Sequence, residues 1–134
     1  MDIKKFAVEP TVRLHLRDAS DELMYADKEK TKEMAVNLYG PGSKQYERAQ
    51  SNQSNRMVDK LKRKGNANQT AEQKREENAE FLTACTAGFE NVEYEKLEGE
   101  FLAKAIYTDI SIGFIADQVA KTLGDWSNFT KRST

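Results

Sequence analysis

The chain contains one histidine and one cysteine, the side chains that most often serve as catalytic bases and nucleophiles. His15 falls on the polar side of an alternating, strand-like pattern, so we expect a solvated residue. Cys85 shares an apolar helical stripe with Phe81 and Leu82, which predicts a small buried filler. A zinc site needs more Cys or His ligands than these two side chains supply. We therefore predict no catalytic, cofactor-binding or metal-binding residues.

Two other sequence patterns indicate structural roles and not catalysis or phosphate binding. Residues 40–44, GPGSK, contain glycines and a lysine before a predicted helix, but they lack the spacing and the Gly-Lys pair of a phosphate-binding loop. Carboxylates such as Glu76, Glu77 and Glu80 have no apolar surroundings that would separate their pKa values for acid–base work. We interpret them as solvated helix faces.

The best basic patch is formed by Lys60, Lys62, Arg63 and Lys64. Such a cluster can contact phosphates. However, no aromatic residues interleave it, and Glu72, Glu76 and Glu77 follow. A solvated helix end is the favoured interpretation, and a small nucleic-acid-associated protein that uses Lys60–Lys64 is kept as the alternative.

The composition limits both the size and the partners of the protein. The 134 residues suit one domain, which we assign to 1–134. Lys and Arg number 21 and Asp and Glu 22, so no strong net charge attracts nucleic acid or an acidic membrane. Charged residues make up 32% and hydrophobic residues 38%. Part of the chain must therefore contribute little to the core.

No stretch is apolar enough for a signal peptide or a membrane span. The single cysteine cannot form an internal disulfide, which fits a reducing compartment. We expect a soluble, cytoplasmic protein.

The N-terminal part, 11–39, has strand patterns. Residues 11–17 alternate polar and apolar side chains, 18–21 read as a turn, and 22–26 form a possible second strand. Residues 34–39 alternate again, although the good helix formers of 27–39 favour a helix instead. We favour the strand and leave the helix open.

The next part, 43–80, is predicted to be a polar helical arm. Ser43 is a suitable N-cap for a helix that runs to Lys64, and Thr70 with Gln73 forms a capping box for the next helix. Apolar residues are sparse throughout both helices. We therefore expect the arm to be poorly buried.

The last part, 81–131, is predicted to be a helical core. The second arm helix is expected to gain a core face that extends to Phe89, and 98–106 forms a short helix. A further helix begins near Asp109 or Ser111 and ends before a left-handed Gly124. Beyond it, Trp126 and Phe129 are predicted to anchor the chain onto the helices that carry Phe81 and Phe101. The fold class is α+β, mainly helical, with a small N-terminal antiparallel sheet.

Four short motifs occur in a particular order. They are Leu38-Tyr39-Gly40-Pro41-Gly42-Ser43-Lys44-Gln45-Tyr46, Asn91-Val92-Glu93-Tyr94, Ile115-Ala116-Asp117-Gln118-Val119 and Asp125-Trp126-Ser127-Asn128-Phe129. Together they resemble the tail assembly chaperones of long-tailed bacteriophages, from about Val12 to Lys131. The resemblance implies a non-enzymatic protein of the host cytoplasm, absent from the mature virion.

That resemblance also implies the partners. It implies binding to the tape measure protein, recruitment of the major tail tube protein, and self-association into helical or spiral arrays, with no nucleic acid and no membrane partner. Family members are often also made with a frameshifted C-terminal extension. We expect the contact surface on the arm, at Tyr46, Met57 and Leu61, together with the edge of the sheet.

Overall fold

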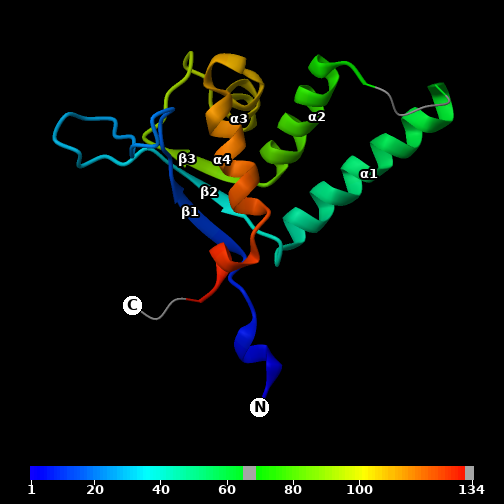
Figure 1. Ribbon diagram of the computed structural model, residues 1–134, viewed down its shortest axis with the longest axis horizontal. Helices are drawn as coiled ribbons and strands as arrows, with labels where there is room; N and C mark the ends of the chain where they lie inside the picture. The colour runs from blue at the N-terminus through cyan, green and yellow to red at the C-terminus, as the bar shows by residue number, and fades with distance from the viewer. Residues whose placement is uncertain (65–68, 132–134) are drawn as a thin grey trace.

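The computed structural model describes residues 1–64 and 69–131, which form the α+β fold that the sequence predicts (Figure 1). These residues contain one three-stranded antiparallel sheet and four α-helices. The strands are β1 (Thr11–His15), β2 (Ala35–Tyr39) and β3 (Thr86–Glu90), and the helices are α1 (Lys44–Lys64), α2 (Ala71–Ala84), α3 (Gly99–Thr108) and α4 (Gly113–Leu123). Short 3-10 turns, η1 (Ile3–Phe6), η2 (Ile110–Ile112) and η3 (Trp126–Phe129), complete them.

The sheet has the order β1-β2-β3, so β2 lies in the middle and pairs on both sides. Val36 lies opposite Leu14 on one side and Phe89 on the other, which places three apolar side chains on the same face. The alternation of polar and apolar residues in β1 and β2 thus acts as predicted, and the strand interpretation of 34–39 is confirmed.

The third strand corrects two predictions. The helix that we expected to extend to Phe89 ends at Ala84, and β3 follows it at once. Its start is fixed by a bond of 2.7 Å from the backbone N–H of Tyr39 to the Cys85 carbonyl. The sheet is therefore not confined to the N-terminal part of the chain. Among the described residues, 22–26 form no strand and contribute only isolated bridges, Arg17 with Leu23 and Tyr25 with Glu33.

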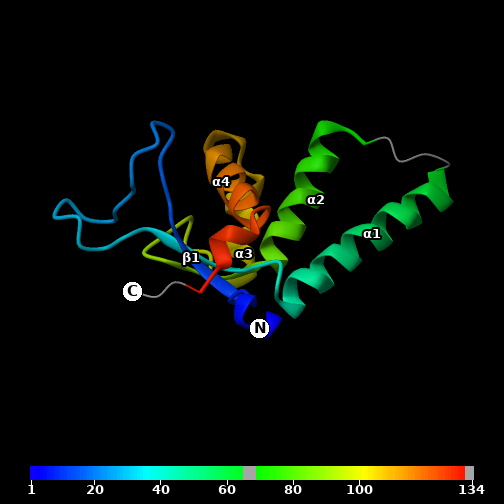
Figure 2. The same ribbon diagram turned by 60° about the horizontal axis from the view of Figure 1, so that its bottom comes forward.

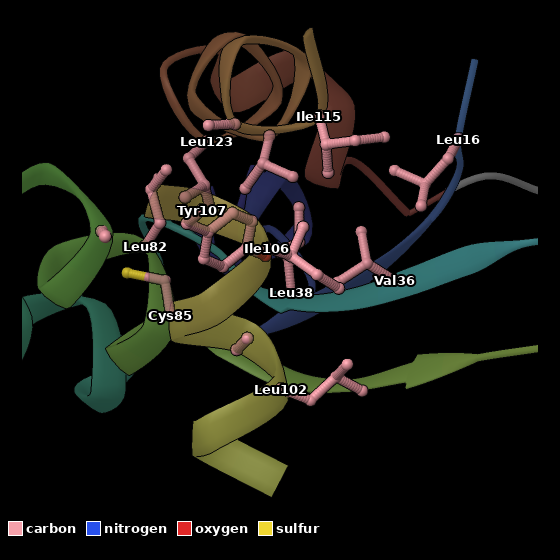
Figure 3. Packing of buried hydrophobic residues seen from close by; sticks show 14 of the residues in the cluster. Leu16, Val36, Leu38, Leu82, Cys85, Leu102, Ile106, Tyr107, Ile115 and Leu123 are labelled. Carbon is pink, nitrogen blue, oxygen red and sulfur yellow. The ribbon is translucent and has the colours of Figure 1, made fainter. Parts of the chain in front are cut away.

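One hydrophobic cluster joins the sheet to the helices. Both views place α2, α3 and α4 on one side of the sheet (Figures 1 and 2). Side chains from β2, such as Val36 and Leu38, meet Ile106 and Tyr107 of α3 and Ile115 of α4 in this layer (Figure 3). The core therefore lies between the sheet and the C-terminal helices.

The C-terminal helix begins and ends differently from the prediction. Asp109 caps η2, where its carboxylate accepts the Ser111 N–H at 2.9 Å, and α4 begins only at Gly113. Gly124 has φ −78°, so the left-handed conformation that we expected there is not used. The backbone instead continues as a turn into η3.

Helix α1 leaves the body of the molecule (Figures 1 and 2). It begins close to the end of β2 and diverges from α2 toward its far end in both views. It is the longest described helix, with 21 residues, and is rich in polar side chains. None of the described helices combines the length and the apolar character that crossing a membrane requires.

Candidate functional site

The start of α1 is set by local capping. The Ser43 hydroxyl accepts the Tyr46 N–H at 3.2 Å and donates to the Gly40 carbonyl at 2.7 Å. These bonds satisfy a donor that the first turn of a helix leaves without a partner. The predicted N-cap is confirmed, and it fixes the point from which the arm projects.

The capping box of α2 is also present. The Gln73 N–H donates to the Thr70 hydroxyl at 3.1 Å, and the Thr70 N–H donates to the Gln73 side chain at 3.0 Å. Two orphan donors are thereby satisfied reciprocally. Both arm helices therefore start where their sequences predict.

At its base, near the sheet, the arm is held by packing. The Tyr46 ring of α1 meets the Phe81 ring of α2 edge-on, with centroids 5.6 Å apart, and Ala49 and Ala79 are buried. Burial raises the pKa of the Tyr46 hydroxyl above its ordinary value. Tyr46 is thus a packing residue at the base, and its predicted role on a contact surface shared with Met57 and Leu61 is not supported by this geometry.

Farther out, polar contacts replace packing. Arg56 pairs with Glu80 at 3.2 Å, Lys60 pairs with Glu77, and Gln69 donates to Glu77 at 2.6 Å. The hydrogen bond from Lys60, the largest effect, holds the pKa of the Glu77 carboxyl below its usual range. Ion pairs near the surface contribute about 0.2–1 kcal/mol each, whereas a fully buried Leu or Phe contributes about 1.5–3 kcal/mol. The outer arm is therefore held weakly to α2.

Apolar side chains on this outer part remain exposed. Met57 is 36% exposed, Val58 47% and Leu61 46%. Met57 and Leu61 are four residues apart, so they lie on one side of α1, whereas Val58 points about 100° away. An open groove of about 560 Å³ lies beside Met57, between the two helices. Its lining consists of Gln53, Met57, Gln69, Ala71, Lys74, Arg75, Glu77 and Asn78.

The predicted contact residues Met57 and Leu61 lie on this exposed part of α1, and the α2 wall of the groove was not predicted. Lys74 and Arg75 form part of that wall. The spacing of Ala71, Lys74, Arg75 and Asn78 places all of them on one helix face, so helical periodicity contained the signal. Nothing local indicated that this face is turned toward α1.

A contact with α2 separates Lys60 from the other residues of the predicted basic patch. Lys60 has 21% of its side chain exposed and is bound to Glu77, whereas Lys62 and Arg63 are exposed. The side chain of Lys64 and the predicted loop 65–68 lie outside the described part of the structure. The four basic residues therefore do not present one common surface through Lys60.

The two predicted anchor residues, Trp126 and Phe129, differ in burial. Phe129 is 1% exposed, and its backbone carbonyl accepts the Glu9 N–H at 2.7 Å, beside β1. Its ring lies against Gly40, so it packs at the end of the sheet and not onto Phe101, which is 70% exposed. Trp126 is 58% exposed, so the prediction that it anchors the chain is wrong.

His15 and Cys85, the residue types that most often serve in catalysis, are both in contact with other protein groups. His15 is half-buried, which corrects its expected solvated position: its Nε2 lies 2.9 Å from the Met24 carbonyl and its ring meets Tyr25 edge-on. Cys85 is fully buried, as predicted, and burial raises the pKa of its thiol to about 12. Among the described residues, no group of three or more His, Cys, Asp or Glu side chains is arranged to hold a metal ion.

A hollow of about 990 Å³ lies beside β3 and the start of α3. Its charged lining residues Glu93, Glu95, Lys96, Glu98 and Glu100 are all exposed to solvent. Catalytic carboxylates are typically activated by burial or by a close partner. The hollow therefore offers a surface depression without the desolvated groups that chemistry needs.

The comparisons with protein-family models, with curated proteins and with solved structures give no match to this chain. The arm formed by α1 and α2, with its exposed Met57, Val58 and Leu61, is the surface on which we base a functional proposal.

Proposed function

We propose that this protein is a non-enzymatic tail assembly chaperone of a long-tailed bacteriophage, which binds the tape measure protein and recruits tail tube subunits. The family assignment rests on the sequence motifs. The observation that supports a binding role is the outer part of α1, where Met57, Val58 and Leu61 are exposed and the described contacts with α2 are ion pairs. Such a helix has unused apolar area that a partner can cover.

The arm suits a reversible contact. Fully burying an apolar side chain of this size yields about 1.5–3 kcal/mol, and association and side-chain ordering cost much of the total. A few such residues therefore give a weak contact. Many copies of the protein can form this contact along an elongated partner, and tube subunits can later replace them. Self-association into arrays and action in the host cytoplasm, without entry into the mature virion, belong to the same proposal.

The alternative, a nucleic-acid-associated phage or regulatory protein, has less support. It depends on Lys60, Lys62, Arg63 and Lys64 acting together, and Lys60 is already bound to Glu77. The acidic residues of α2 lie next to this site. It predicts salt-sensitive DNA binding that is lost when these residues are changed to Glu.

The proposal is tested by co-expression with the candidate tape measure protein encoded downstream, followed by affinity purification and mass measurement of the complex. We expect the long protein to stay soluble and to co-purify with many copies of this chain. An insoluble tape measure protein with nothing bound would refute the proposal.

A matched pair of variants locates the surface. The double variant Met57→Ser with Leu61→Ser should lose the complex and keep the fold, because both side chains are exposed. The control is Phe101→Ser with Ile110→Ser, which removes two apolar residues that are 70% and 71% exposed on the C-terminal part. Tyr46 is left unchanged, because its packing on Phe81 is structural.

A further inference from the structure

The α1–α2 groove is lined by residues of both helices, and the apolar residue Met57 lies on its α1 side. Gln53 and Met57 come from α1, and Ala71, Lys74 and Asn78 come from α2. Leu61 continues the Met57 side of α1 by one turn. Met is flexible and adapts to differently shaped apolar partners. The α1 wall therefore carries one apolar lining residue, Met57, with the exposed Leu61 one turn farther along the helix, and the α2 wall is mostly polar.

The charge of the lining is positive. Its charged members are Lys74, Arg75 and Glu77. Glu77 is neutralised by Lys60, whereas no ion pair among the described residues involves Lys74 or Arg75. Two positive charges are thus available to a ligand on the α2 wall. A carboxylate or a phosphate complements them, because an Arg guanidinium binds either group in a two-pronged geometry.

The helices that line the groove also favour one backbone conformation of the ligand. Both are α-helices, whose mid-helix N–H and C=O groups are already bonded within the helix. Along the mid-helix parts of these walls an extended peptide would find no free backbone groups to pair with, whereas a helix satisfies its own backbone groups. A ligand helix would contact the groove through side chains alone, with apolar anchors at intervals of three and four residues.

From these observations, we propose that the α1–α2 groove binds an amphipathic α-helix that places its apolar stripe on Met57 and Leu61 and its flanking carboxylates on Lys74 and Arg75. This inference deepens the proposed function, on which it rests, by naming the chemical class of the partner segment. A DNA duplex is disfavoured as the occupant, because Met57 in the lining offers no donor to a phosphate and α2 carries Glu72, Glu76 and Glu77 beside its two basic residues.

The experiment measures the binding of labelled helical peptides of about 18 residues, or five turns, by fluorescence anisotropy. The first peptide has a Leu stripe flanked by Glu, the second has the same stripe flanked by Lys, and the third has the composition of the first with the stripe scrambled. We expect the first to bind at least tenfold more tightly than either of the others. Its advantage over the second should shrink as salt is added, because the charges are exposed.

Variants of the protein identify the groove. Lys74→Glu with Arg75→Glu should weaken the Glu-flanked peptide about tenfold or more and strengthen the Lys-flanked one, and Met57→Ser with Leu61→Ser should weaken both. Lys121→Glu, which reverses an exposed charge on α4, should change neither. Circular dichroism of each variant confirms that the helices are intact.

Three results would overturn the inference: equal binding of all three peptides, insensitivity to the Lys74 and Arg75 reversal, or displacement of the Glu-flanked peptide by a DNA duplex at lower concentration. The chaperone proposal is tested separately from the groove inference. If the tape measure protein co-purifies while the peptides show no preference, only the groove inference is wrong. If the peptides bind as expected and nothing co-purifies, the groove inference stands and the chaperone proposal falls.

Discussion

The arm and the body of this protein are stabilised in different ways. In the body, Leu38 and Val119 are fully buried in the core cluster, and Phe129 joins the same cluster at the end of the sheet. In α1, Ala49 is the sole buried residue among 44–63, and the outer contacts are ion pairs. Packing in the body contributes several times more per residue than ion pairing in the arm. The body can thus hold the fold while the arm keeps apolar residues available.

The largest expected effect lies in the body, at Phe129. Phe129→Ala should lower the free energy of unfolding by about 3–5 kcal/mol, because it leaves a cavity in a fully packed site. Trp126→Ala, the matched control three residues earlier, should cost less than about 1 kcal/mol, since that ring is mostly exposed. Urea denaturation measures both. Equal effects would contradict the division of the two predicted anchors.

The next effect concerns Gly40, the partner of Phe129. A Cβ atom built at Gly40 would lie about 2.2 Å from the Phe129 ring. Gly40→Ala should therefore cost about 1–3 kcal/mol through overpacking. In the background of Phe129→Ala most of this cost should disappear, because the clashing ring is absent. Strict additivity in the double-mutant cycle would show that the two residues do not share this contact.

In the arm, the capping box should have a smaller effect. Thr70→Ala removes the acceptor for the Gln73 N–H and should cost about 1 kcal/mol. The loss should appear first as faster amide hydrogen exchange in the first turns of α2, while the exchange of β2 stays unchanged. Simultaneous loss of protection in β2 would indicate that arm and body unfold as one unit.

The smallest effect concerns pH and the Lys60–Glu77 pair. The folded pKa of Glu77 is lowered, chiefly by the hydrogen bond from Lys60. Its stabilisation is therefore complete above the ordinary Glu pKa of about 4.3, and it is lost as the pH falls through the lower folded value. Glu77→Gln should destabilise the protein at pH 7 by about 1 kcal/mol or less and have little effect at pH 3.

Several other carboxyls also have lowered pKa values, among them Glu33 and Glu90 beside Arg13. For that reason the measurement is the difference between wild type and Glu77→Gln at each pH, which cancels their contribution. Glu76→Gln, an exposed neighbour on the same helix, serves as the control. A difference that grows on acidification would contradict the assigned direction of the shift.

Features that depend on neighbouring residues could be predicted from the sequence. Ser43 and the Thr70–Gln73 box fixed the starts of α1 and α2, because a cap binds backbone donors within its own first turn. Alternation in 11–17 and 34–39 predicted the strands that the structure places at 11–15 and 35–39, because one apolar face of a strand must be buried. The α+β class, the exposed arm with Met57 and Leu61, and the buried Cys85 followed from such local patterns.

Contacts between segments that are distant in the sequence could not be predicted in this way. Residues 86–90 form a strand because they pair with the edge of β2, although the apolar spacing of Cys85 and Phe89 favours a helix. Phe129 is buried and Trp126 exposed because Gly40, far away in sequence, leaves room for one ring. Lys60 leaves the basic patch because α2 brings Glu77 beside it. Each outcome depends on a partner more than ten residues away, which no local pattern of polarity or propensity can specify.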